Sequence, residues 1–162
     1  MTMRINETGY ASHPALSHGD RIAASTSDAV LLIGRILMAY IFIRSGWGKL
    51  MDMGAFAASM PNRGGLPTWL AYVAAPVEFF GGLALLLGLA TRYVALLMFL
   101  FVLVAAVSSH RYWTFTDPAQ YRNQNSHFYK NISMMGGLLF LFVAGAGRFS
   151  LDYWLGRRRD QL

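Results

Sequence analysis

A glutamate stands in the middle of a long apolar stretch of this sequence. Glu78 lies within residues 69–89, and it is the single charged residue of that run. A charged group at bilayer depth costs at least ~2.5–3.5 kcal/mol on insertion scales, and such a group usually faces the protein interior and finds a partner. A carboxylate held in this way can accept a proton from a bound molecule, so Glu78 is the first catalytic candidate.

Two basic residues of an earlier apolar run are candidates to pair with Glu78. Arg44 lies a few residues past the middle of that run, and Lys49 lies about one turn further out. A rise of about 1.5 Å per helical residue brings Arg44 within side-chain reach of the depth of Glu78. We therefore expect Arg44 or Lys49 to set the charge of Glu78, with Arg44 as the catalytic charge partner and Lys49 also as a cofactor contact.

Further polar side chains are expected near the same depth. Lys130 and Asn131 enter a later apolar run from its outer boundary, and His110 stands at the outer end of another. These groups can donate hydrogen bonds to a carbonyl oxygen. Together with Glu78 they predict a site for a quinone or a similar lipophilic molecule in the outer half of a helical bundle. Trp113 is a candidate ring contact for the same molecule.

The same residues also allow a purely structural interpretation. Glu78 and an arginine could simply hold the helices together, although a buried ion pair is weak evidence for stability. His110 and His127 flank one outer loop, but their placement at helix boundaries does not favour a haem held between two histidines. The sequence has no metal-binding spacing such as HExxH and no phosphate-binding glycine motif, so we expect no metal site.

Four apolar runs must position these side chains. They are residues 29–51, 68–90, 92–110 and 126–147. Each is near the ~20 residues that a ~30 Å hydrocarbon layer requires, and none alternates as a strand would. We expect an all-α, membrane-spanning four-helix bundle at residues 29–155. A flexible polar tail at 1–28 and a basic tail at 156–162 would flank it.

The helix face that carries Glu78 is expected to lie against another helix. Positions three, four and seven residues away share that face. They are almost all small: Ala71, Ala74, Ala75, Gly81, Gly82 and Leu85. Because small residues let transmembrane helices approach closely, Glu78 should sit at a helix–helix contact rather than against lipid.

Charge placement suggests an orientation for the bundle. Only 14% of the 162 residues are charged, against the ~25% usual for soluble domains. The net charge is +6, but the basic residues are spread along the chain or flank apolar runs, which suits membrane boundaries and argues against nucleic-acid binding.

Lys and Arg are more frequent on the side of the bundle that holds both termini, where Arg157, Arg158 and Arg159 cluster. We expect both termini in the cytoplasm.

The sequence contains no cysteine. It therefore offers no disulfide, thiolate nucleophile or cysteine-ligated iron–sulfur cluster. A redox role would have to use a bound cofactor such as a quinone, or a partner subunit.

In order and content, several segments resemble those of the DoxX family of small bacterial integral membrane proteins. The segments are Gly34-Arg35, Ser45–Lys49, Gly65–Pro67, Val77–Gly82, His110–Trp113, His127–Asn131, Gly136-Gly137 and Gly147–Asp152. The resemblance covers roughly residues 29–155. It implies a four-helix protein of the bacterial inner membrane, and it favours a role in a membrane-associated, quinone-linked oxidoreductase assembly.

We therefore expect a small inner-membrane subunit of a redox system that binds a quinone in the outer half of its bundle. It would contact the lipid bilayer and either a partner membrane subunit or further copies of itself. One alternative is a non-catalytic accessory or assembly subunit whose buried charges hold the bundle and a partner helix. A third is a small-molecule transporter, although four unbroken helices argue against it for a monomer.

Overall fold

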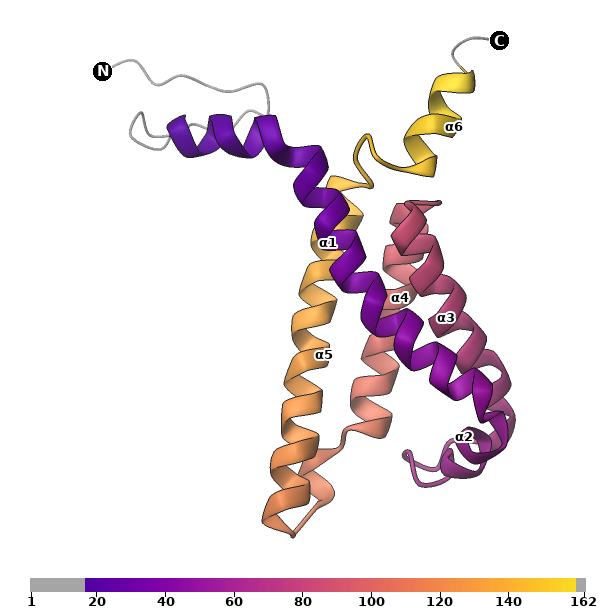
Figure 1. Cartoon of the computed structure of the whole chain (residues 1–162). Coiled ribbons are helices and arrows are strands. Elements are labelled where there is room, and N and C mark those ends of the chain that lie inside the picture. Colours follow the sequence, from indigo (N-terminus) through magenta and orange to yellow (C-terminus); the bar gives the residue numbers. More distant parts are fainter. Residues whose placement is uncertain (1–16, 160–162) are drawn as a thin grey trace.

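A computed structural model describes residues 17–159, and all regular structure within that range is helical. The helices are α1 (Ser17–Met51), α2 (Met53–Ser59), α3 (Ala71–Leu87), α4 (Thr91–Ser109), α5 (Pro118–Ala144) and α6 (Leu151–Arg159), with single 3-10 turns at Thr68–Leu70 and Tyr112–Thr114. The long helices are α1, α3, α4 and α5. Figure 1 shows α2 at one end of the molecule and α6 at the other. We call these the α2 end and the α6 end. The expectation of an all-α fold is confirmed.

Three helical segments are long and apolar enough to cross a membrane: Gly19–Met51, Thr68–Leu87 and Thr91–Thr114. The sequence predicted four. The expected span at 126–147 coincides largely with α5, which is 27 residues long. The first half of α5 is rich in polar and charged residues, because Arg122 and Lys130 lie among several asparagines and glutamines. Three of the four expected spans are therefore found among the described residues.

The first helix begins earlier than the sequence suggested. α1 starts at Ser17, so residues 17–28 are helical rather than a flexible tail. Two hydroxyl groups of this polar stretch bond to the helix backbone: Ser25 and Thr26 each donate to the Ile22 carbonyl. The rest of the expected tail lies outside the described residues. At the other terminus α6 extends the helical structure to Arg159, within the expected basic tail.

The long helices pack mainly as two pairs, α1 along α3 and α4 along α5. Glycines allow the first pair to approach closely. A Cβ placed on Gly46 of α1 would lie 2.7 Å from the Phe79 nitrogen, and one on Gly82 of α3 would lie 2.9 Å from the Phe42 Cβ. The prediction for the face of Glu78 is confirmed, since Ala71, Ala75, Gly81, Gly82 and Leu85 are all buried with it.

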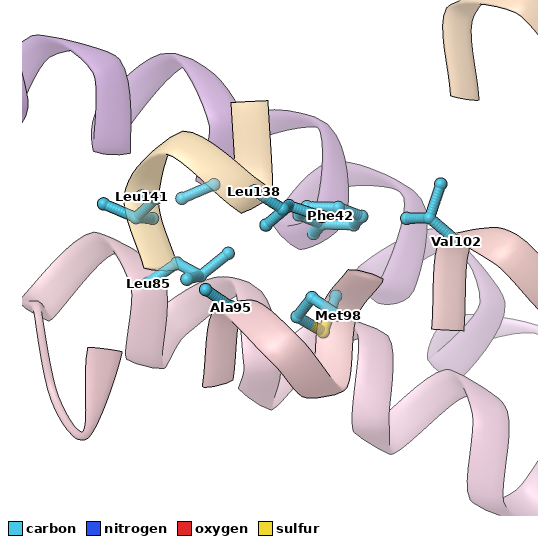
Figure 2. Packing of buried hydrophobic residues seen from close by; sticks show 8 residues of the cluster. Phe42, Leu85, Ala95, Met98, Val102, Leu138 and Leu141 are labelled. Carbon is cyan, nitrogen blue, oxygen red and sulfur yellow. The ribbon is translucent and has the colours of Figure 1, made fainter. Parts of the chain in front are cut away.

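A hydrophobic core joins the two pairs (Figure 2). Its buried members come from all four long helices: Ala39, Phe42, Leu85, Ala95, Met98, Val102, Leu138 and Leu141. Burying a side chain the size of leucine or phenylalanine in a soluble core contributes about 1.5–3 kcal/mol. In a bilayer the corresponding gain comes mostly from close packing rather than from exclusion of water.

At the α6 end, the last segment of the chain closes over the turn between α3 and α4. Arg35 of α1 is 1% exposed and donates to the backbone carbonyls of Leu86 and Phe149. The Asp152 carboxylate accepts from the amides of Ala90 (2.6 Å) and Thr91 (2.8 Å), which caps the start of α4. We call Arg35, Asp152 and these backbone partners the backbone clasp.

The clasp holds an unusual backbone conformation. Ala90 has φ of 47°, in the left-handed region that residues with a Cβ rarely occupy. This conformation costs roughly 1–2 kcal/mol for a non-glycine residue. The hydrogen bond from the Ala90 amide to Asp152 helps to offset that cost.

Candidate functional site

A cavity of about 370 Å³ lies between the helices toward the α2 end. Side chains from α1, α3, α4 and α5 line its sides, and α2 with the loop after it supplies Phe56, Met60, Arg63 and Leu66. Most of the lining is apolar. Its polar members are Ser45, Lys49, Arg63, Glu78, Ser108, Ser109, His110, Lys130 and Asn131. Mostly apolar walls with a few convergent polar groups are typical of a small-molecule site.

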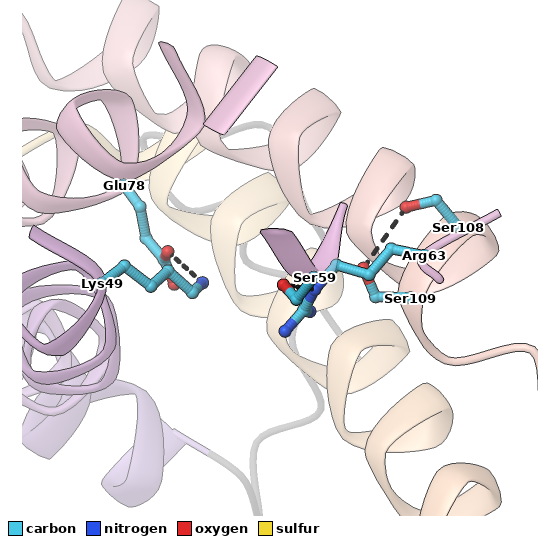
Figure 3. A network of polar contacts seen from close by, with 6 residues as sticks. All are labelled: Lys49, Ser59, Arg63, Glu78, Ser108 and Ser109. Atoms are coloured by element: carbon cyan, nitrogen blue, oxygen red, sulfur yellow. Dashed lines mark hydrogen bonds and ion pairs between the residues drawn. The ribbon is translucent and has the colours of Figure 1, made fainter. Parts of the chain in front are cut away.

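Glu78 forms an ion pair with Lys49 at this cavity (Figure 3). The side chain of Glu78 is 7% exposed and that of Lys49 is 25% exposed. The small-residue face of α3 brings Glu78 against α1, where Phe42, Ser45 and Lys49 follow one another at helical spacing on one face. A carboxylate beside an ammonium group in apolar surroundings can exchange a proton with a bound molecule.

Arg44 does not form the expected pair with Glu78. Its side chain is exposed, it does not line the cavity, and it makes no ion pair within the described range. The prediction compared depth along the helix but not direction around it. Because Arg44 and Lys49 are not separated by three, four or seven residues, the two side chains leave α1 in different directions. Lys49, the other candidate, is the partner.

Asn131 of α5 is 6% exposed and lines the cavity. No hydrogen bond to its side chain is found among residues 17–159. Its amide atoms are not among the fully enclosed unpartnered atoms of the described residues, which are Arg35 Nε and Thr91 Oγ1, so they are accessible from the cavity. Such an amide can donate hydrogen bonds to a ligand and accept them from it.

His110 and Lys130 reach the same cavity through a chain of contacts. Lys130 Nζ lies 3.1 Å from His127 Nδ1. The His127 ring stacks on His110 with 5.0 Å between ring centroids, and His110 Nδ1 lies 2.9 Å from Gln124 Oε1. The structure therefore brings five sequence-predicted site residues to one cavity: Glu78, Lys49, His110, Lys130 and Asn131.

Trp113 lies outside the cavity. Its side chain is 53% exposed, and it packs edge to face with Tyr112 and Phe128 in an aromatic cluster. The structure thus separates Trp113 from the other predicted cofactor contacts.

The sequence interpretation missed Arg63 as a member of the site. Arg63 donates from Nε to Ser59 Oγ (3.0 Å; Figure 3). Its guanidinium carbon lies 5.4 Å from the centre of the Phe56 ring. Lys49 Nζ approaches the same ring at 5.2 Å. Arg63 belongs to a loop with no periodic pattern, so only its position between two prolines, Pro61 and Pro67, signals a fixed turn.

No group of three or more histidine, cysteine, aspartate or glutamate side chains that could hold a metal ion occurs in the described part of the chain. The polar side chains of the cavity can form hydrogen bonds, exchange protons and pair with charges.

Comparison with known proteins places the chain in a family. The DoxX family model matches residues 30–111. Inner membrane protein YphA of Escherichia coli K12 is 36% identical over 124 residues, covering 76% of this chain and 88% of the relative. Inner membrane protein YqjF of the same strain is 34% identical over 131 residues, covering 81% of this chain and 95% of the relative.

A more distant relative is an uncharacterized membrane protein of Mycobacterium tuberculosis, 28% identical over 96% of both chains. No solved structure matches the chain. Three apolar helices able to span a bilayer agree with the inner-membrane location of the relatives. The protein is a multi-pass inner membrane protein, and it belongs to the DoxX family.

Proposed function

We propose that this protein is a small subunit of a membrane redox system and that it binds a quinone, or a similar lipophilic molecule, in the cavity at the α2 end. One observation carries the proposal: a mostly apolar cavity of about 370 Å³ contains a shielded ion pair, Glu78–Lys49, and an amide, Asn131, that has no partner among the described residues. Apolar walls suit a ring and its tail, and the polar groups suit ring oxygens.

Each polar residue then has a role. Glu78 accepts a proton from a hydroxyl group of the bound molecule, and Lys49 sets the charge of Glu78. Asn131, His110 and Lys130 donate hydrogen bonds to ring oxygens. Arg44 takes no part, because its side chain is exposed away from the cavity.

Electrons have to leave through the bound molecule or a neighbouring protein. The sequence has no cysteine for an iron–sulfur cluster or a dithiol pair. A partner membrane subunit, or an assembly of several copies, would supply the next carrier.

The proposal includes a membrane topology. α5 crosses the bilayer as a fourth span, both termini lie in the cytoplasm, and the α2 end faces outward. The packing of α5 along α4 and the excess of Lys and Arg on the terminal side support this arrangement. Because the chain has no cysteine, Gln120→Cys and Gln161→Cys each introduce a single thiol. Each variant is treated in intact cells with a thiol reagent that does not cross the membrane. Labelling at Gln120 alone is expected, and labelling at Gln161 would contradict the topology.

The function is tested by binding to the purified protein. Full-length protein is titrated with a short-chain quinone, and tryptophan fluorescence or calorimetry follows the binding. We expect saturable binding that Glu78→Gln weakens. Asp20→Asn removes the same charge from an exposed position near the start of α1 and should leave binding unchanged. Absence of quinone binding, together with unchanged membrane redox activity in Glu78→Gln, would refute the proposal.

A second function has its own supporting observation. The Glu78–Lys49 pair joins α1 to α3, as expected of a non-catalytic accessory or assembly subunit held together by buried charges. In that case Glu78→Gln lowers the yield of the protein or of its complex with a partner. Ligand binding would then be absent from the unmodified protein as well.

A further inference from the structure

The cavity at the α2 end contains more positive than negative groups. Lys49, Arg63 and Lys130 line it, and Glu78 is the single acidic residue among its described lining. Lys49 is paired with Glu78. Two cations of the lining are therefore left without an acidic counterpart.

The contacts of these two cations do not neutralise them. Arg63 donates from Nε to a neutral serine hydroxyl, and Lys130 lies against Nδ1 of His127, which carries no negative charge. Neither forms an ion pair with any residue of the described range. The Nη atoms of Arg63 have no hydrogen-bond partner there either.

The remaining acids of this end are engaged elsewhere. The Asp52 carboxylate accepts from the Ala55 amide and caps α2, and the Asp117 carboxylate accepts from the Gln120 amide and caps α5. Neither lines the cavity. The described part of the chain thus supplies no second anion to this space. Arg63 is partly exposed and Lys130 is exposed, so both cations are accessible to an incoming anion.

Another part of the lining is apolar and reaches the protein surface. Val73 of α3 and Leu97, Leu100 and Val104 of α4 line the cavity and are each about half exposed. These helices are among the candidate membrane spans, so their exposed aliphatic side chains face lipid. A ligand in this space therefore has both cations and lipid-facing aliphatic groups around it.

We propose that the cavity binds its ligand as a lipophilic oxyanion: an apolar ring or chain with one ionised oxygen, held by Arg63 and Lys130 beside the Glu78–Lys49 pair. The inference rests on the proposed function and narrows its ligand. Charge-assisted hydrogen bonds from two cations are roughly twice as strong as neutral ones, so the ionised form is selected over a neutral one of the same shape.

The same arrangement accounts for the fate of the ligand after proton transfer to Glu78. When a quinol gives one hydroxyl proton to the Glu78 carboxylate, its O–H bond breaks, a new O–H bond forms on Glu78, and the electron pair stays on the ring oxygen. The products are a quinolate anion and a neutral carboxylic acid. Lys49 loses its anionic partner in this step, and Lys49, Arg63 and Lys130 then face the new anion together.

A matched pair of ligands tests the inference. A 2-hydroxy-3-alkyl-1,4-naphthoquinone is ionised at neutral pH, whereas its methyl ether is neutral and has nearly the same shape. Both are titrated into the full-length protein in nanodiscs of zwitterionic lipid. We expect the hydroxyl compound to bind at least about tenfold more tightly, which corresponds to one charge-assisted contact.

Substitutions of the two cations test which residues cause the preference for the ionised compound. Arg63→Gln and Lys130→Gln should each weaken binding of the ionised compound by about tenfold and weaken binding of the ether by clearly less. Arg122→Gln is the control, because it removes a charge from an exposed position of α5 that does not line the cavity. Neither Arg63 nor Lys130 is fully buried, so both variants should fold.

The outcomes are distinguishable. Equal affinity for the two compounds, or equal losses for both in Arg63→Gln and Lys130→Gln, overturns the oxyanion inference while the proposed function stands. Binding of neither compound overturns both. Preference for the ionised compound that is lost in these two variants but kept in Arg122→Gln supports the inference.

Discussion

α1 carries one enclosed cation toward each end of the molecule, and their surroundings differ. Arg35 is fully enclosed in the backbone clasp and donates to carbonyls that belong to other elements. Lys49 is a quarter exposed, pairs with a side-chain carboxylate, and borders an open cavity. At the α6 end the main chain is the partner of the cation. At the α2 end the amide of Asn131 has no partner among the described residues, and Arg63 and Lys130 have only neutral ones.

The two ends therefore differ in the kind of partner that a buried charge has. Burial alone does not separate them, since Glu78 and Arg35 are both buried. Arg35 bonds main-chain carbonyls, whereas Glu78 bonds a side-chain ammonium group beside a cavity. Substitutions at the two ends should therefore differ in size and in kind.

The largest effect is expected from Arg35→Met. The change leaves the carbonyls of Leu86 and Phe149 without this donor. At about 1–3 kcal/mol for each unsatisfied group, it should lower the free energy of unfolding by about 2–6 kcal/mol. Thermal unfolding of the purified protein in detergent measures it. Arg44→Met is the matched control on the same helix and should cost less than about 1 kcal/mol, because Arg44 is exposed. Similar losses in both variants would remove the contrast between the two ends.

Asp152→Ala should come next. It removes the acceptor for two backbone amides at the start of α4, and loss of a helix cap costs about 0.5–2 kcal/mol. Asp152→Asn keeps one carbonyl oxygen and should fall between Ala and the native residue. The same unfolding measurement applies. Ligand affinity at the α2 end should stay unchanged in both variants, and a change there would show that the two ends are coupled.

Asn131→Leu is expected to separate stability from binding. The asparagine has no described partner, so an apolar replacement should raise the free energy of unfolding by up to about 1 kcal/mol. Ligand affinity should fall by about tenfold because one hydrogen bond is lost. Asn123→Leu is the control at an exposed position of α5. A marked loss of stability in Asn131→Leu would assign Asn131 to structure instead.

The smallest effect is expected from Ala90→Gly. Glycine adopts positive φ at little cost, which relieves roughly 1–2 kcal/mol of strain. Glycine also has more conformational freedom in the unfolded chain, which lowers the free energy of unfolding by about 0.4–1 kcal/mol. The net gain, about 0.5 kcal/mol in the free energy of unfolding, should be measurable as a small rise in the unfolding midpoint. A lower unfolding midpoint would mean that packing of the Ala90 methyl group stabilises the folded protein.

The fold and much of the site could be predicted from sequence because both depend on helical periodicity. The small residues around Glu78 correctly placed it between helices, and depth along the spans correctly gathered His110, Lys130 and Asn131. Arg44 was misplaced because depth was used without direction. Lys49 shares a face of α1 with Ser45, and Arg44 lies on another face. Comparing direction around the helix as well as depth would have favoured Lys49 over Arg44.

Other features carry no periodic signal. Arg63 reaches the cavity from a loop whose path depends on close packing, since a Cβ on Gly64 would lie 3.3 Å from the Ser108 carbonyl oxygen. The early start of α1 was missed because its first turns are polar, and hydrophobicity was the criterion for a helix. Trp113 was predicted as a ring contact, whereas it packs in an aromatic cluster with Tyr112 and Phe128 and does not line the cavity.

The contact between Asp152 and the turn at Ala90 has a consequence for how the protein is made. The two partners lie 62 residues apart in the sequence, so Asp152 is translated well after the α3–α4 hairpin. Until Asp152 has been translated, the strained turn of this hairpin has no such partner. A chain truncated before α6 would therefore keep its apolar helices but lack this closure.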